Sequence, residues 1–130
     1  RLWSETHGSH QPDEIAAYLN FAHVRFAPAI RSVATGRFSE RHDGDDGRGG
    51  FGIATLSRFP IVRQRVHGYA PYRGKTRRNA LACLVELSGG TTLWVVNTHL
   101  GCHTGGEQYQ QATELSEFID SLESPVGMAG

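Results

Sequence analysis

Apolar residues recur at every second position along two neighbouring stretches of the chain, and this pattern predicts two strands. The first stretch covers residues 79–87, and its apolar face consists of Leu81, Cys83, Val85 and Leu87. The second covers residues 92–100, where both faces are apolar as far as Val96, as in an interior strand. Ser88-Gly89-Gly90-Thr91 lies between them and has turn chemistry, so we expect an antiparallel hairpin.

Helical spacing of apolar residues predicts two helices. The first opens at Pro12, and its expected buried face consists of Ile15, Tyr18, Leu19 and Ala22. The second runs from about residue 106 to residue 122 and begins after Thr104, a residue type that caps helices. Its expected buried stripe consists of Tyr109, Ala112, Leu115, Ile119 and Leu122.

Four shorter strands complete the prediction, at residues 23–27, 51–57, 61–67 and 126–129. Pro28 is expected to end or edge the first of them, and residues 36–50 have the composition of a solvated loop. Strands buried on both faces with helices outside them indicate an α/β (α+β) layered sandwich. The hairpin indicates that the sheet is mostly antiparallel rather than purely parallel.

The composition is that of one domain covering residues 1–130. Thirteen Lys and Arg residues balance thirteen Asp and Glu residues, so charge alone does not favour a nucleic-acid partner. Two cysteines are too few for a disulfide scaffold, and no apolar run approaches the roughly 20 residues of a transmembrane helix. The sequence shows no sign of an oligomer, and it leaves the cellular compartment open.

Polar side chains appear at the C-terminal end of the strand predicted at residues 92–100. Asn97 and His99 share one face there, at the kind of position where α/β proteins often carry functional groups. An imidazole can bind an oxyanion, transfer a proton or ligate a metal, whereas a strand end with ordinary satisfied polar groups is the alternative. Arg78, at the start of the preceding strand, suits phosphate recognition. Glu5 is either a magnesium ligand or a solvated acid.

A thiol beside two imidazoles leaves two further interpretations open. His99, Cys102 and His103 form an H-x2-C-H segment, which is compatible with a zinc module, although no second ligand pair follows. Cys102 with His99 could instead form a nucleophilic pair. Cys83 is expected to be a small core residue.

Several segments, in order along the chain, resemble the endonuclease/exonuclease/phosphatase superfamily. Residues 50–61 (GFGIATLSRFPI) resemble the family's G-x-G-N-A-I-L-S-R-x-P-I strand, and residues 78–81 (RNAL) resemble its R-G-A-L strand start. Residues 97–100 (NTHL) match its N-T-H-L segment, and a glutamine-rich helix follows, as in many members. Glu5 lies where the family has a metal-binding glutamate, and residues 125–130 resemble the strand that leads to its G-D-F-N or G-D-L-N motif.

The resemblance implies a deoxyribonuclease-I-like fold, of which this chain would form a central fragment of a four-layer α/β/β/α sandwich. It implies a Mg²⁺- or Mn²⁺-dependent hydrolase acting on phosphodiesters or phosphomonoesters, such as a nuclease. Glu5 would hold the metal, His99 would contact the phosphate or stabilise developing charge, and Asn97 would help position it. Arg78 would be a cation on the phosphate side. The substrate stays open among DNA, RNA, a phosphoinositide or inositol phosphate headgroup, and sphingomyelin.

The chain also departs from the family pattern. Ser4 replaces the usual Gln and Ile53 replaces the usual Asn, which motivates a non-catalytic binding module on the same fold as the alternative. Residue 130 precedes the expected Asp and Asn, and the family's first strand and its Asp-His segment have no counterpart here. We therefore expect these 130 residues to be inactive alone and the parent protein to be the enzyme.

Overall fold

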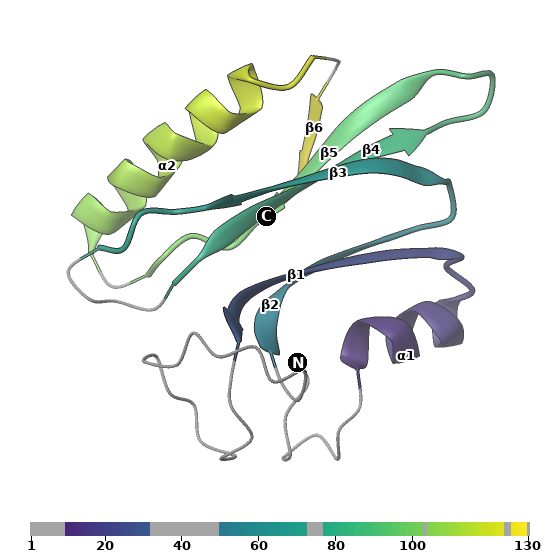
Figure 1. Cartoon of the computed structure of the whole chain (residues 1–130), viewed down its shortest axis with the longest axis horizontal. Coiled ribbons are helices and arrows are strands. Elements are labelled where there is room, and N and C mark those ends of the chain that lie inside the picture. Colours follow the sequence, from purple (N-terminus) through teal and green to yellow (C-terminus); the bar gives the residue numbers. More distant parts are fainter. Residues whose placement is uncertain (1–9, 32–49, 73–76, 103, 124–125, 130) are drawn as a thin grey trace.

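The computed structural model describes residues 10–31, 50–72, 77–102, 104–123 and 126–129. Within these ranges the chain forms two helices and six strands (Figure 1). In chain order they are α1 (Gln11–Leu19), β1 (His23–Arg31), β2 (Gly50–Ser57), β3 (Ile61–Gly68), β4 (Asn79–Glu86), β5 (Thr92–Thr98), α2 (Gly105–Asp120) and β6 (Val126–Ala129).

The six strands form two sheets. β1 and β2 make an antiparallel pair, and β3, β4, β5 and β6 make a four-stranded sheet in that order. The first three strands of the larger sheet are antiparallel, whereas β6 runs parallel to β5. The prediction of an α+β fold with mostly antiparallel sheet is confirmed.

The tight turn between β4 and β5 has the backbone that its glycines predict. Gly89 and Gly90 have φ angles of 84° and 79°, a left-handed conformation that side chains beyond glycine disfavour. The amide of Leu87 donates to the carbonyl of Thr91 at 2.7 Å and closes the turn. The hairpin predicted at residues 88–91 is therefore confirmed.

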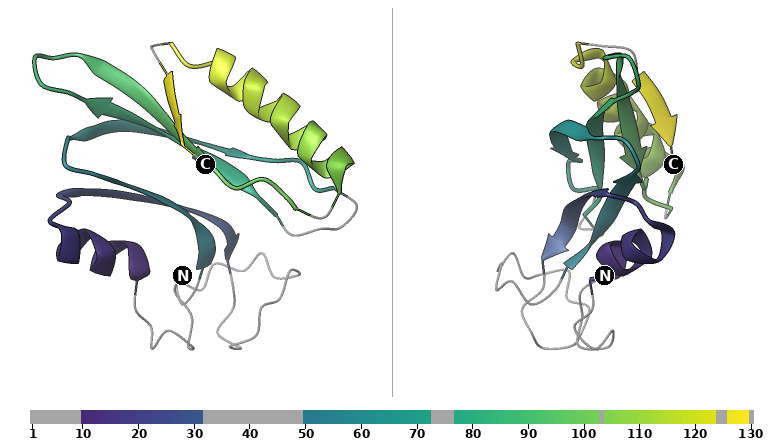
Figure 2. Two further views of the ribbon diagram at one scale, coloured as in Figure 1. Left: turned by 180° about the vertical axis from the view of Figure 1, so that it is seen from behind. Right: turned by 90° about the vertical axis from the view of Figure 1, so that its right-hand side faces the viewer.

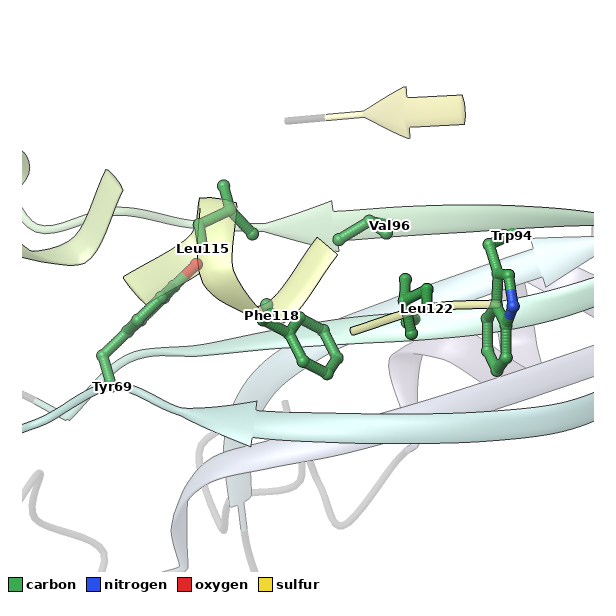
Figure 3. Packing of buried hydrophobic residues seen from close by; sticks show 8 residues of the cluster. Tyr69, Trp94, Val96, Leu115, Phe118 and Leu122 are labelled. Atoms are coloured by element: carbon green, nitrogen blue, oxygen red, sulfur yellow. The ribbon is translucent and has the colours of Figure 1, made fainter. Parts of the chain in front are cut away.

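Helix α2 covers one face of the larger sheet. The apolar cluster between them joins Tyr69, Ala80, Ala82, Trp94, Val96, Leu115, Phe118 and Leu122. Figure 3 shows Leu115, Phe118 and Leu122 of the helical segment over Trp94 and Val96 of β5. These contacts remove a large apolar area from water, which is the main favourable term in folding.

The two sheets pack against each other on the opposite face of β4. Ala27 of β1 lies there with Ile61, Leu81, Cys83 and Val85. Both faces of β4 are thus buried, and the shared face predicted for residues 81–87 is confirmed. Helix α1 lies against β1 and β2, away from α2 (Figures 1 and 2).

In the first part of the chain, the prediction for the face of α1 is wrong and the prediction for Pro28 holds in one of its two alternatives. The predicted face of α1 is not buried, since Ile15, Tyr18 and Leu19 are 51%, 88% and 46% exposed and Ala22 lies outside the helix. Ala16 and Pro12 are its buried residues instead. Pro28 does not end β1, which continues to Arg31, but the alternative that Pro28 lies on an edge strand is confirmed, because β1 belongs to a two-stranded sheet with β2.

The predicted buried stripe of α2 is confirmed at Leu115, Ile119 and Leu122, which belong to or pack against the core, but not in its first part. Tyr109 is 78% exposed and Ala112 is exposed, whereas the helix buries Glu107, Gln111, Leu115 and Phe118. Thr104 caps the helix as predicted, because its hydroxyl accepts from the Glu107 amide at 3.2 Å. The polar members of this stripe were missed because periodicity counts only apolar residues.

Among the described residues, no helix is both long and apolar enough to cross a membrane. The loop predicted at residues 36–50 lies outside the described residues except for Gly50, which begins β2.

Candidate functional site

A cavity of about 580 Å³ lies at the C-terminal end of β5. It is lined by Asn97, Thr98, His99 and Leu100 from β5 and the residues after it, together with Ile53 from β2. The structure therefore brings the two predicted site residues Asn97 and His99 to one cavity. It also places Ile53 there, at the position where the family pattern has Asn.

Asn97 is held by a hydrogen bond between the two sheets. Its Nδ2 donates to the carbonyl oxygen of Ala54 on β2 at 2.9 Å, and the side chain is partly buried. The Asn97 amide thus uses one of its donors in this hydrogen bond, which holds the side chain in place. The carboxamide group therefore has a fixed orientation at the wall of the cavity. The sequence predicted the face on which Asn97 lies, but not this partner.

His99 follows β5 directly, and its side chain is exposed. Within the described residues, no hydrogen bond or ion pair occupies its imidazole. An exposed imidazole at this position can form a hydrogen bond with a bound molecule. Of the predicted site residues, His99 is the one whose position best suits direct contact with a bound molecule.

Thr98 points to the opposite face from Asn97 and anchors the strand end. Its hydroxyl donates to the carbonyl of Asn79 at 3.2 Å and lies 2.7 Å from the hydroxyl of Tyr69. Burial raises the pKa of Tyr69, an effect that the hydrogen bond to Thr98 partly opposes. The phenol therefore stays neutral and serves as a structural hydrogen-bonding group.

The loop after His99 is held by a polar clamp, which consists of Glu107 and Gln111 in the first turns of α2. The buried side chain of Gln111 accepts a hydrogen bond from the Gly101 amide at 2.6 Å and lies 3.4 Å from Oε1 of Glu107. Glu107 and Gln111 are 1% and 2% exposed. A side chain at Gly101 would collide with the Glu107 carboxyl group, so the loop can approach the helix only with glycine there.

This polar clamp was missed at the level of sequence. Thr104 is the predicted helix cap and Glu107 follows it at the spacing of a capping pair, but Gln111 has the sequence context of an ordinary solvated helix residue. A polar residue four positions after a capping glutamate, on the side of the helix that faces the sheet, is the signal that could have found it. The clamp fixes the position of the Gly101 backbone, two residues after His99.

Arg78 lies in a second cavity, not in the one lined by His99. This cavity measures about 390 Å³ and is lined by Pro28, Ala29, Gly68, Tyr69, Pro71, Arg77, Arg78 and Asn79. The Arg78 guanidinium carbon lies 5.6 Å from the centre of the Phe51 ring. Asn79 is buried and donates from Nδ2 to the Ala27 carbonyl at 3.2 Å, which makes a second polar link between the sheets.

The described residues do not by themselves form a metal centre. No group of three or more His, Cys, Asp or Glu side chains comes together among them. Glu5, the predicted metal ligand, and His103, a residue of the zinc interpretation, both lie outside the described residues.

The two cysteines have separate environments. Cys83 is buried in the core between the sheets, as predicted, and burial raises the pKa of its thiol. Cys102 is exposed on the loop after β5. Cys83 is therefore a poor nucleophile, because the thiolate is the reactive form.

Comparison with protein-family models, with curated proteins and with solved structures finds no match for this chain.

Proposed function

We propose that this chain carries part of the active site of a metal-dependent phosphoesterase related to the endonuclease/exonuclease/phosphatase superfamily. The observation that carries the proposal is the cavity where Asn97 and His99 meet beside Ile53. Residues 53 and 97, which are 44 positions apart in the sequence, line the same cavity. If the short motifs resembled the family by chance alone, there would be no reason for residues 53 and 97 to line one cavity.

The packing also supports a finer proposal for the fold. Helix α1, the β1–β2 pair, the larger sheet and α2 follow one another in space (Figures 1 and 2). We propose that this arrangement is part of a four-layer α/β/β/α sandwich of the deoxyribonuclease-I-like type. In that fold the ends of β2, β4 and β5 would form one side of the active-site groove.

In the proposed reaction His99 contacts the phosphate oxygens, and its protonated form would stabilise negative charge that develops during hydrolysis. Asn97, oriented by Ala54, holds the wall against which the phosphate lies. Glu5 would help to hold Mg²⁺ or Mn²⁺, which polarises phosphoryl oxygens in such enzymes. The remaining ligands and the base would come from other residues of the parent protein.

The second candidate function is a non-catalytic binding module on the same fold. The observation that favours it is Ile53, because an apolar side chain lines the cavity at the position where the family has a polar one. An apolar wall cannot donate a hydrogen bond to a phosphoryl oxygen. Such a module would bind a phosphoester without turning it over.

Both candidate functions require a phosphate group to bind at the cavity lined by Asn97 and His99. Titration with dimethyl phosphate tests this binding, and the backbone amide and imidazole NMR signals report it. We expect the signals of residues 97–100 to shift, and the affinity to fall roughly tenfold in His99→Ala, since a charge-assisted hydrogen bond is removed. His23→Ala is the matched control, because His23 lies at the start of β1 and lines neither cavity.

Turnover separates the two candidates. Hydrolysis of an activated phosphodiester by the parent protein in Mg²⁺, abolished by a chelator, favours the enzyme. Binding without turnover under the same conditions favours the module. Absence of any shift at residues 97–100 would rule out both.

A further inference from the structure

Arg78 and His99 lie at the same end of the larger sheet but line different cavities. Ala80 of β4 is paired with Thr98 of β5, so the start of the first strand adjoins the end of the second. Nevertheless His99 lines the cavity that reaches Ile53 on β2, whereas Arg78 lines the one that reaches β1. Two neighbouring binding volumes therefore open at this end of the sandwich.

The second cavity has a positive lining. Its described lining residues include Arg77 and Arg78 and no Asp or Glu. Among the described residues no carboxylate pairs with Arg78, which is only partly exposed and rests on the Phe51 ring. A guanidinium in a partly buried cavity is less screened than one on an open surface, so its attraction for an anion is stronger.

A carboxylate of α2 lies close to this cavity, but its oxygens are engaged by other groups. Glu114 of α2 reaches Ala70, which lies between two lining residues, and accepts from its amide at 3.0 Å. Gln110 also donates to this carboxylate at 2.9 Å, and His67 lies 3.3 Å from it. Both oxygens of Glu114 thus have partners on Ala70, His67 and Gln110.

We propose that the Arg77–Arg78 cavity binds a second phosphate group of the same substrate whose reacting phosphate lies against His99. This inference rests on the proposed function and narrows its substrate class to molecules with at least two phosphates. Guanidinium groups recognise phosphate through paired hydrogen bonds as well as charge. A single phosphodiester with a neutral headgroup would leave this cavity without a charged partner.

Titration of the unmodified chain, followed by its backbone amide NMR signals, is the first test. The probes are dimethyl phosphate, a four-nucleotide oligothymidylate and inositol bisphosphate. We expect dimethyl phosphate to shift residues 97–100 alone. At least one of the other two probes shifts Gly68 and Arg78 as well and binds at least tenfold more tightly. The oligothymidylate and inositol arms distinguish a nucleic-acid source from a headgroup source of the two phosphates.

The variant Arg78→Ala is the second test. It should remove the tenfold gain of the doubly phosphorylated probe while the affinity for dimethyl phosphate changes less than about twofold. For the oligothymidylate, the slope of log affinity against log salt should become shallower by about 0.7, as for one lost phosphate contact on a single strand. Arg63→Ala is the matched control, since Arg63 is exposed on β3, carries the same charge and lines neither cavity.

Three results would overturn the proposal. The first is that the doubly phosphorylated probes bind the unmodified chain no more tightly than dimethyl phosphate does. This comparison does not depend on the folding of any variant. The gain could survive in Arg78→Ala. Alternatively, Arg78→Ala could weaken dimethyl phosphate as much as the other probes, which would place Arg78 and His99 on one phosphate. If the two-site binding holds but the parent protein shows no turnover, the phosphoesterase proposal fails and the second phosphate site stands.

Discussion

Asn97 and His99 are two residues apart on one face of a strand, yet their environments differ. Asn97 lies within the sandwich and donates a hydrogen bond to Ala54, whereas His99 lies beyond the last residue of β5 and is exposed. Asn97 can therefore hold the wall of the cavity in place, and His99 can contact a ligand. Both contributions depend on where the strand ends, which Gly101 and its helix contacts determine.

The Gln111 side chain offers a direct test of that clamp. We expect Gln111→Leu to lower the free energy of unfolding by about 1–3 kcal/mol, because the buried Gly101 amide loses its acceptor. The His99 imidazole signals should also broaden or split, since the backbone two residues away is released. Urea unfolding and histidine NMR spectra measure the two effects.

Gln108→Leu is the control for this change, because Gln108 lies on the exposed side of the same helix. Its effect should stay within about 0.5 kcal/mol, as for most surface substitutions. A Gln111 variant with unchanged His99 signals would show that the clamp stabilises the fold without positioning the imidazole.

At the scale of the elements, the predicted boundaries succeed where periodicity and turn chemistry act together. The β4–β5 hairpin follows from two apolar strand patterns on either side of the turn residues Gly89 and Gly90, and the start of α2 follows from its capping threonine. The prediction of a buried face on α1 is wrong because no described residue covers its apolar side chains. Helical spacing alone therefore does not determine burial.

Helix α2 is attached to β3 by a polar cluster that apolar patterns cannot reveal. Glu114 accepts from Gln110 and the Ala70 amide and lies 3.3 Å from His67, whose ring stacks on Phe118 at 5.4 Å. Burial by itself would raise the pKa of Glu114, but the hydrogen bonds from Gln110, Ala70 and His67 together outweigh it and lower the pKa. The charged form is therefore favoured in the folded state.

This lowered pKa fixes the sign of a pH dependence. The contribution of Glu114 to stability should be complete above its unfolded pKa of about 4.3 and should be lost as the pH falls through the lower folded value. Glu114→Gln should therefore reduce the free energy of unfolding by about 1–2 kcal/mol at neutral pH, where charge-assisted hydrogen bonds are lost. Near pH 3 the difference should shrink.

Urea unfolding across this pH range measures the effect, with Glu117→Gln as the control on the exposed side of the helix. An equal loss at every pH would contradict the role of the charge and would indicate a packing effect instead.

At the scale of the whole molecule, two asparagine amides link the sheets near the cavities. Asn79 donates to Ala27 of β1, and Asn97 donates to Ala54 of β2. Sequence reasoning assigned Asn97 to the site from its position on the strand and from a family motif. The partners of both amides depend on how the two sheets stack, which no local pattern encodes.

Replacing Asn97 tests the link between the sheets. Asn97→Leu leaves the Ala54 carbonyl without its donor, and the free energy of unfolding should fall by about 1–3 kcal/mol. The amides of β1 and β2 should lose more protection in hydrogen exchange than those of β5 and α2, because the smaller sheet is released first. Gln64→Leu, at an exposed position on β3, should leave both sheets equally protected. Uniform loss of protection would contradict a local link.

The central claim is that the end of β5 forms part of a phosphoesterase site centred on His99. The most direct measurement is hydrolysis of a phosphodiester by the parent protein in Mg²⁺, compared between the unmodified protein, His99→Ala and His23→Ala. We predict metal-dependent turnover that His99→Ala lowers by at least about a hundredfold, in the range of general acid–base contributions, and that His23→Ala leaves unchanged. Equal turnover in all three proteins, or none in the unmodified protein with its metal bound, would contradict the claim.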